Sequence, residues 1–142
     1  MVGFGCTAFD IQERVKNPLP HRLLLIEETK DVQRVIQLGL ELIAGFEVVC
    51  MQPSASWLEL VNASPPSLIL LDMFPKGNHI LSTLRKTSET QTLPVICIVA
   101  RDRTYDYLQA TKQGATAIVA KPFDLYHLAD TIHEILDIPT QD

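Results

Sequence analysis

Cysteine is scarce in this chain of 142 residues, which contains only Cys6, Cys50 and Cys97. The spacing of these three residues matches no metal-binding motif. Cys50 and Cys97 lie inside apolar runs, where a reduced cysteine behaves as a small hydrophobic residue. We therefore expect reduced cysteines in the core, and neither a disulfide nor a cysteine metal site.

Positive charge is also scarce, because the chain has 12 Lys and Arg against 17 Asp and Glu, a formal net charge of −5. No part of the sequence concentrates lysine or arginine. Non-specific binding to nucleic acid and binding to anionic membranes both depend on concentrated positive charge. We therefore expect neither nucleic acid nor a membrane as a direct partner.

Long apolar runs are absent as well. No run approaches the about 20 residues that a helix needs to cross a bilayer. The first twenty residues lack both a basic start and a long apolar stretch, which disfavours a secretory signal peptide. The expected location is therefore the cytoplasm.

The chain does have enough apolar residues for one core. Hydrophobic residues make up 46% of it and charged residues 20%, which is typical of a globular protein. A chain of 142 residues can bury one substantial core but is too short for two ordinary ones. We expect one domain over residues 21–138, preceded by an N-terminal arm or linker (1–20) and followed by a C-terminal tail (139–142).

Short apolar runs alternate with segments of helical periodicity along the chain. The expected strands are 22–26, 46–50, 67–71, 94–99 and 116–120. The expected helices are about 29–43, a short helix that Pro53 opens with Ser54 as N-cap, 78–86, 104–113 and a last helix from about Asp124. This alternation predicts an α/β fold in which helices cover both faces of one parallel sheet.

Three details refine this prediction. Glu47 interrupts the apolar run of the second strand, which favours a position at the sheet edge. Gly114 is expected to end the fourth helix in the C′ position. One side of the first helix is expected to face inward, and it comprises Val32, Val35, Ile36, Gly39, Leu42 and Ile43.

Charged side chains follow three of the expected strands. Glu27 and Glu28 come directly after the first strand, Asp72 after the third and Lys121 after the fifth. Because the carboxyl ends of parallel strands meet at the sheet edge where ligands bind, we expect these residues to converge. Neighbouring carboxylates repel one another unless a cation lies among them. Oxygen ligands without histidine or cysteine favour Mg²⁺, and Lys121 could neutralise a bound oxyanion.

Each of these residues also has a purely structural interpretation. Asp72 could cap a loop at a strand end, and Lys121 could be its salt-bridge partner without any ligand. The Glu27 and Glu28 side chains could be solvated, with only one of them facing the site. The pattern alone leaves these alternatives open.

Four segments carry a resemblance to a known family. They are "LLLIEET", "PPSLILLDM", "LPVICIVA" and "GATAIVAKPFD", and the last is the most specific. On these segments, residues 22–136 resemble the receiver domain of bacterial two-component response regulators. The resemblance implies a flavodoxin-like, doubly wound five-stranded parallel sheet with the strand order 2-1-3-4-5.

The resemblance also implies a role for each charged residue. Asp72 matches the phosphoacceptor, and Lys121 matches the lysine that contacts the phosphoryl group. Glu27 and Glu28, together with Asp72, match the acidic residues that hold Mg²⁺. The implied partner is a histidine kinase or phosphotransfer protein that donates the phosphoryl group, after which the domain changes its surface for a further partner.

The chain departs from the family pattern at four positions. The family usually has Thr or Ser where this chain has Val99, and Tyr or Phe where it has Ile118. Glu28 replaces the usual metal-binding aspartate, and Pro75 lies three positions after Asp72 instead of four. Valine cannot donate the hydrogen bond that the usual hydroxyl makes to the phosphoryl group. Two parts of the usual conformational relay are therefore missing.

A candidate partner surface lies on helix 104–113 and the last helix, where the family commonly dimerises or docks partners. Aromatic and arginine side chains are enriched at protein interfaces. On this surface they are Arg101, Arg103, Tyr105, Tyr107 and Tyr126. The same composition is equally typical of ordinary amphipathic helix exteriors.

Three functions fit the sequence. The first is a receiver domain that is phosphorylated on Asp72 in a phosphorelay. The second is a pseudo-receiver, a protein-interaction module that a partner reads without phosphorylation. The third, a small phosphohydrolase with Asp72 as nucleophile, is disfavoured because no second general acid or base is visible beside it. We therefore expect a signalling module and not an enzyme.

Overall fold

Five strands alternate with five helices in the computed structural model, which describes residues 21–138. The strands are β1 (Arg22–Ile26), β2 (Glu47–Met51), β3 (Leu68–Asp72), β4 (Val95–Ala100) and β5 (Ala117–Lys121). The helices are α2 (Lys30–Ala44), α3 (Trp57–Ala63), α4 (Gly77–Lys86), α5 (Thr104–Lys112) and α6 (Leu125–Leu136). Every strand after the first begins and ends one residue later than predicted. The arm and the tail expected at 1–20 and 139–142 lie outside the described residues.

The strands form one parallel sheet in the order β2-β1-β3-β4-β5. This confirms the predicted α/β class and the flavodoxin-like strand order. β2 lies at the edge, as predicted from Glu47, whose side chain is exposed there. β3 lies in the middle of the sheet, and all five of its residues are buried.

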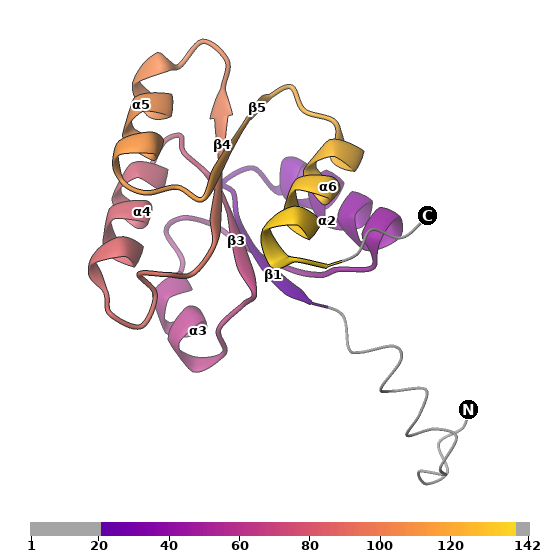
Figure 1. Cartoon of the computed structure of the whole chain (residues 1–142), viewed down its shortest axis with the longest axis horizontal. Helices are drawn as coiled ribbons and strands as arrows, with labels where there is room; N and C mark the ends of the chain where they lie inside the picture. The colour runs from indigo at the N-terminus through magenta and orange to yellow at the C-terminus, as the bar shows by residue number, and fades with distance from the viewer. Residues whose placement is uncertain (1–20, 139–142) are drawn as a thin grey trace, which may run out of the picture.

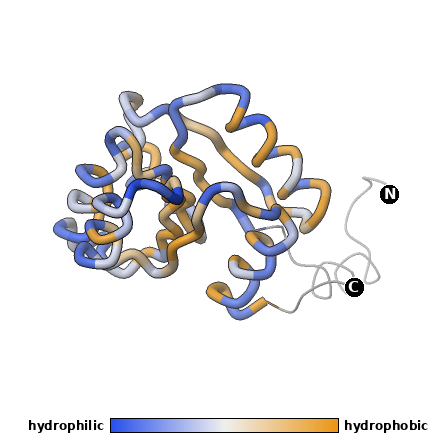
Figure 2. The backbone as a smooth tube through the Cα atoms, turned by 90° about the horizontal axis from the view of Figure 1, so that it is seen from above, coloured by the Kyte–Doolittle hydropathy of each residue, from blue (hydrophilic) through white to orange (hydrophobic). Residues whose placement is uncertain are grey.

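Helices cover both faces of the sheet. α2 and α6 lie on one face, and α3, α4 and α5 lie on the other (Figure 1). Because successive side chains of a strand point to opposite faces, Leu23 and Leu25 of β1 join the core under α2 and α6, whereas Leu24 and Ile26 join the other core. Figure 2 shows the central strands as the most hydrophobic part of the backbone, surrounded by helices of mixed hydropathy. None of the helices in residues 21–138 is long and apolar enough to cross a membrane.

The predicted start of the short second helix, which is α3 in the structure, is wrong. α3 begins at Trp57 with Ser56 as its N-cap, not at Ser54. The residues before it form a turn in which the Ala55 N–H donates to the Gln52 carbonyl at 3.0 Å. That turn buries Pro53, so the proline ends the preceding segment instead of opening the helix.

The predicted inward side of α2 is wrong at two positions. Val35 is 61% exposed and Leu42 is 83% exposed. The buried residues of α2 are Ile36 and Leu40, which point at the sheet. Gly39 faces α6 instead, because a Cβ placed there would lie 2.4 Å from Leu125 Cδ1. The packed surface is therefore rotated away from Val35 and Leu42.

The remaining helices follow the sequence pattern closely. α4 buries Ile80, Leu81 and Leu84, which recur at helical spacing along one side of the helix. Gly114 follows the C-cap of α5 with a φ of +91°, a left-handed conformation that favours glycine and confirms the predicted C′ position. Asp124 caps α6, because its side chain accepts a hydrogen bond from the Tyr126 N–H at 2.8 Å.

Candidate functional site

Asp72 and Lys121 meet at the carboxyl edge of the sheet. Asp72 ends β3 and Lys121 ends β5, so the lysine side chain reaches past the end of β4. Lys121 Nζ donates to Asp72 Oδ2 at 2.6 Å. The Asp72 side chain is only 7% exposed, whereas the Lys121 side chain is 36% exposed, so a buried acid is paired with a partly exposed lysine. The predicted convergence of these two residues is therefore present in the structure.

The second oxygen of Asp72 is also occupied. The backbone N–H of Phe74 donates to Asp72 Oδ1 at 3.1 Å. One donor on each oxygen fixes the orientation of the carboxyl group. The anionic form is the one that can act as a nucleophile.

Glu27 is the second buried acid of the site, and it follows β1 directly. It is 4% exposed, and its Oε2 accepts a hydrogen bond from the Thr29 N–H at 2.9 Å. Its Oε1 is buried without a hydrogen-bond partner among the described residues. The nearest cation to Oε1 is Lys121, whose Nζ lies 4.0 Å away and thus beyond hydrogen-bonding distance.

The environment of Glu27 favours its protonated form. Burial is the largest cause, and the neighbouring Asp72 carboxyl adds to it, because it favours a proton on Glu27 and repels a second negative charge. The Thr29 N–H and the charge of Lys121 act in the opposite direction but do not cancel these effects. Together they raise the pKa of Glu27 from 4.5 to about 7. Glu27 thus keeps a proton up to nearly neutral pH.

Glu28 does not join this cluster, because its side chain is exposed. Its backbone carbonyl accepts a hydrogen bond from Gln52 Nε2 at 3.2 Å, which ties the loop to the segment after β2. Across residues 21–138, no three His, Cys, Asp or Glu side chains lie close enough together to hold a metal ion. The structure therefore brings together Glu27, Asp72 and Lys121 and leaves Glu28 outside.

The chemistry of the buried pair nevertheless fits a hard cation. Glu27 and Asp72 supply only oxygen donors, and Glu27 Oε1 lacks a partner. Mg²⁺ prefers oxygen ligands, is commonly bound by one or two carboxylates, and keeps several waters. An ion that replaces the proton of Glu27 would also relieve the repulsion between the two acids.

The two positions that lack the usual relay residues are part of the core. Val99 is 3% exposed and packs with the core cluster under α3, α4 and α5. Ile118 is partly buried against the same cluster. Neither side chain carries a polar atom, so the wall of the site beside β4 offers no side-chain hydrogen bond from these positions.

The sequence analysis missed the roles of three residues near the acceptor, Gly77, Phe74 and Arg103, although it named Arg103 as part of the candidate partner surface. A Cβ at Gly77 would lie 2.4 Å from the Asp72 carbonyl oxygen, so only glycine allows α4 to begin this close to β3. The Arg103 guanidinium stacks on the Phe74 ring at 4.2 Å from its centre. Arg103 also donates to Asp106 Oδ2 at 2.5 Å, which links the loop after Asp72 to the start of α5. The sequence does show Gly77 as a glycine five positions after the acceptor. No local sequence pattern predicts the stacking of Arg103 on Phe74, because the two residues lie in different loops.

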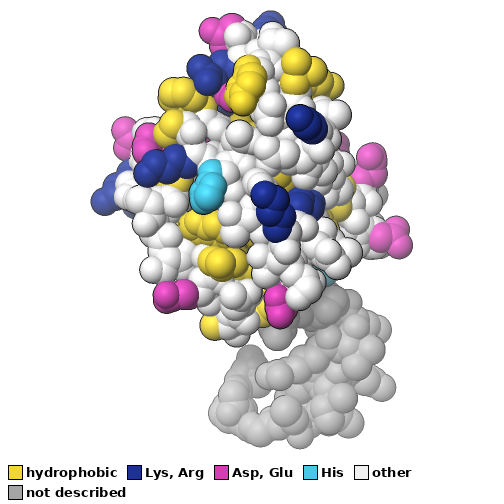
Figure 3. All heavy atoms as spheres, turned by 90° about the vertical axis from the view of Figure 1, so that its left-hand side faces the viewer, with side chains coloured by type: hydrophobic (Ala, Val, Ile, Leu, Met, Phe, Trp, Pro, Cys, Tyr) yellow, Lys and Arg dark blue, Asp and Glu magenta, His cyan; other side chains and the backbone are white. Residues whose placement is uncertain are grey.

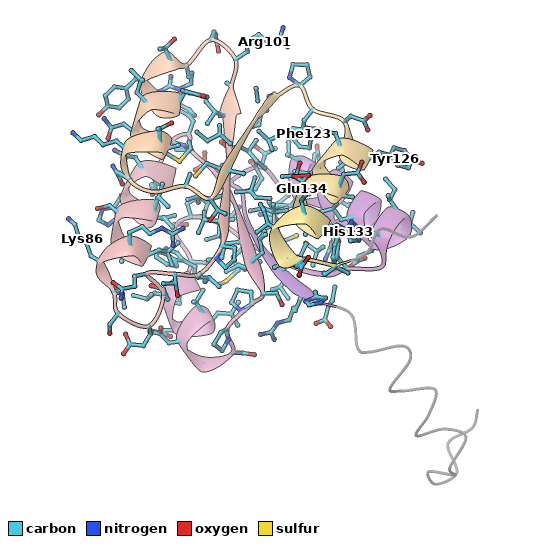
Figure 4. The ribbon with its side chains drawn as sticks, viewed as in Figure 1. Lys86, Arg101, Phe123, Tyr126, His133 and Glu134 are labelled. Atoms are coloured by element: carbon cyan, nitrogen blue, oxygen red, sulfur yellow. The ribbon has the colours of Figure 1, made fainter. Side chains whose placement is uncertain are left out.

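A groove of about 610 Å³ adjoins Lys121. Its lining residues are Val32, Ala100, Arg101, Asp102, Lys121, Pro122 and Phe123. Figure 4 shows Arg101 on the loop after β4 and Phe123 on the loop after β5, so two loops and α2 border the groove. The site is therefore open to a partner on the side of Lys121.

The candidate partner surface on α5 and α6 is partly confirmed as exposed. Tyr105, Tyr107 and Tyr126 are 63%, 52% and 66% exposed, and Arg101 and Arg103 are exposed as well. Figure 3 shows the face formed by α3, α4 and α5, on which apolar, basic and acidic side chains are interspersed. Exposure makes these side chains accessible, and their use by a partner stays a prediction.

Curated relatives resemble the chain over the same region. The transcriptional regulatory protein CseB of Streptomyces avermitilis is 33% identical over 114 residues, which is 80% of this chain and 48% of that protein. The uncharacterized transcriptional regulatory protein YkoG of Bacillus subtilis is 36% identical over 117 residues, 80% of this chain and 50% of that protein. This chain spans about half the length of these relatives.

A solved structure and a family model agree with these relatives. A sensor protein from Polaromonas sp. JS666 superposes with a TM-score of 0.73 and 27% identity, covering 84% of this chain and 98% of that one. The model of the response regulator receiver domain matches residues 23–133, which is well over half of the chain. Together with the parallel sheet and the acidic site at its carboxyl edge, these matches show that the chain belongs to the family of response regulator receiver domains.

Proposed function

We propose that Asp72 accepts a phosphoryl group from a histidine kinase or a phosphotransfer protein. The observation that supports this best is the position of Asp72, whose carboxyl group is buried and in contact with Lys121 at 2.6 Å. A structural ion pair alone would explain that contact. It would not explain why a second acid, Glu27, is buried beside the pair with one oxygen unpartnered.

The proposed step is an in-line transfer. An oxygen of Asp72 forms a bond to phosphorus while the P–N bond of the donor phosphohistidine breaks, and the bonding electrons leave with the imidazole nitrogen, which takes up a proton. The ammonium group of Lys121 neutralises charge on the transferred oxygens. To do so, it exchanges its contact with Asp72 Oδ2 for one with the phosphoryl group.

Mg²⁺ would be held by Glu27 and Asp72, and it would supply neutralisation of the phosphoryl oxygens. Glu28 was predicted as a third ligand, and its exposed side chain would reach the ion only through a change of rotamer or a bridging water. We therefore rank Glu27 and Asp72 above Glu28 as ligands. Binding of the ion also requires Glu27 to release its proton.

The partners of the whole protein are proposals as well. We propose a kinase or phosphotransfer protein as donor, in the cytoplasm, and a homodimer or protein partner on the α5 and α6 surface. The named relatives are transcriptional regulators, but this chain spans only about half of them. The net charge of −5 supports a protein partner for this domain over direct contact with nucleic acid.

A pseudo-receiver is the second candidate function. The specific observation that favours it is that the apolar side chains of Val99, which is buried, and Ile118, which is partly buried, replace the hydroxyl and the aromatic switch expected for the relay. In that case a partner would recognise the surface in one fixed state. Phosphorylation would then be absent or without effect on the surface.

Intact mass after incubation with acetyl phosphate and Mg²⁺ separates these functions. A receiver gains the mass of one phosphoryl group, and Asp72→Asn gains none. A pseudo-receiver gains no mass under the same conditions. Continuous release of inorganic phosphate, with Asp72 required, would instead indicate a phosphohydrolase.

A further inference from the structure

One side of α2 carries an exposed apolar stripe. Val35, Leu38 and Leu42 are 61%, 49% and 83% exposed. At about 100° per residue these three side chains lie within an arc of about 60° on the helix. They are three of the eight exposed large hydrophobic residues in residues 21–138, so α2 concentrates apolar surface that neither the sheet nor α6 covers.

A groove lies beside the first half of this stripe. It has a volume of about 330 Å³ and lies between α2 and the start of α6. Its lining residues are Asp31, Val32, Val35, Ile36, Phe123 and Leu125. Figure 4 shows Phe123 just before α6, which lies on the same face of the sheet as α2. Five of the six lining residues are apolar, so the groove suits an aliphatic side chain.

The projecting residue and the groove are complementary within one chain. Leu42, the most exposed residue of the stripe, lies seven positions after Val35, about 10.5 Å along the helix axis. A two-fold axis close to Leu38 would exchange the two ends of the stripe. Leu42 of each copy would then enter the groove of the other, which is the reciprocal contact that a two-fold interface requires.

The charges beside the stripe favour the antiparallel arrangement. Arg34 is exposed and Glu41 is partly exposed. They are seven positions apart and lie about 20° from each other around the helix, on one flank of the stripe. Antiparallel pairing brings Arg34 of one copy near Glu41 of the other, twice. In a parallel two-fold pair the two flanks exchange sides, so Arg34 and Glu41 of one copy would lie across the interface from those of the other and could not pair.

We propose that two copies of this chain associate through α2 in an antiparallel, two-fold arrangement centred on Leu38. Leu42 of each copy fills the groove between α2 and α6 of the other. This surface is on the opposite face of the sheet from α5. The dimer requires no phosphorylation of Asp72, so its test is independent of the test of the proposed receiver function.

Sedimentation velocity of residues 1–142 over a range of concentrations tests the proposal. We expect the wild-type chain to form a dimer. We expect Leu42→Glu to raise the dissociation constant of this dimer by at least about tenfold. Leu108→Glu is the matched control, because Leu108 is 58% exposed on α5 and the substitution should leave a dimer formed through α2 unchanged, whereas it would weaken a dimer formed through the α5 and α6 surface. Thermal melts of each variant establish that the monomers stay folded.

Charge reversal tests the antiparallel geometry itself. Arg34→Glu and Glu41→Arg should each weaken the dimer, and the double variant should restore it. Failure of the double variant to restore the dimer would overturn the antiparallel arrangement. Oxidation of Leu38→Cys should give a disulfide-linked dimer that neither the wild type nor Leu108→Cys gives, because only Leu38 lies near the axis.

Three results would overturn the proposal. One is a monomer at every concentration, and another is a dimer that Leu108→Glu disrupts while Leu42→Glu does not. The third is a monomer that binds a phosphorylated histidine kinase domain through Leu42, since the occupant of the stripe would then be the kinase.

Discussion

Lys121 Nζ lies 2.6 Å from Asp72 Oδ2, although 49 positions separate the two residues in the sequence. The contact exists because β3 and β5 end at the same edge of the sheet with only β4 between them. It places a cation where a transferred phosphoryl group would develop its negative charge. A lysine in that position is useful to a phosphoacceptor and unnecessary to a simple loop cap.

Lys121→Gln should slow phosphorylation by acetyl phosphate by about 100-fold, because the glutamine amide cannot neutralise the equatorial oxygens. The rate of mass gain in the presence of Mg²⁺ measures this effect. Lys121→Arg is the matched control, since it keeps the charge and should retain part of the rate. Equal rates for wild type and Lys121→Gln would show that the lysine has only a structural role.

Glu27→Gln should change how stability depends on pH. The pKa of Glu27 is raised in the folded state to about 7 from 4.5, so the stabilisation from its proton is complete below 4.5 and is lost as the pH rises through about 7. Urea unfolding without Mg²⁺ should therefore show the wild type losing stability over this window relative to Glu27→Gln. A constant difference between the two proteins across the window would contradict the raised pKa.

Mg²⁺ binding should release protons, because the ion needs the ionised form of Glu27. Below pH 7, calorimetry in two buffers of different ionisation enthalpy should report the release of up to about one proton per ion. Glu27→Gln should weaken the affinity by about tenfold or more, whereas the exposed Glu28→Gln should weaken it by less than about threefold. The reverse ranking of these two variants would mean that Glu28 turns inward in the bound state.

Gly77→Ala should destabilise the domain by about 1–3 kcal/mol, because the added Cβ would lie against backbone that cannot move aside. The atom it would meet is the Asp72 carbonyl oxygen, at 2.4 Å. Gly39→Ala is the matched control, since its Cβ would also lie at 2.4 Å from a neighbour, but that neighbour is the flexible tip of Leu125. Urea unfolding should show a clearly smaller loss for Gly39→Ala than for Gly77→Ala.

Residues at strand ends were the easiest to predict from the sequence. The apolar runs before Asp72 and Lys121 identify buried strands, and parallel topology brings the ends of such strands to one edge. The periodicity of α4 and α6 was similarly clear, because each helix presents one apolar side to one core. The position of the site could therefore be predicted from two things: the apolar runs that identify the strands, and the parallel topology that brings the ends of the strands together.

Other features depend on packing that no local pattern specifies. Glu27 and Glu28 are adjacent acids, and only the direction of the chain after β1 buries the first and exposes the second. Val35 and Leu42 fit an inward helical pattern, yet α6 approaches α2 at Gly39 and leaves both exposed. The stack of Arg103 on Phe74 joins two loops that are far apart in sequence. Each of these outcomes is decided by a tertiary neighbour.

The most direct test of the proposed function is to locate the phosphoryl group by mass spectrometry after incubation with phosphoramidate and Mg²⁺, because this donor carries the P–N bond of phosphohistidine. We predict one phosphoryl group per chain, on the peptide that contains Asp72, and none in Asp72→Asn. An unmodified wild-type protein, or a phosphoryl group that persists in Asp72→Asn, would contradict the proposal that Asp72 is the acceptor.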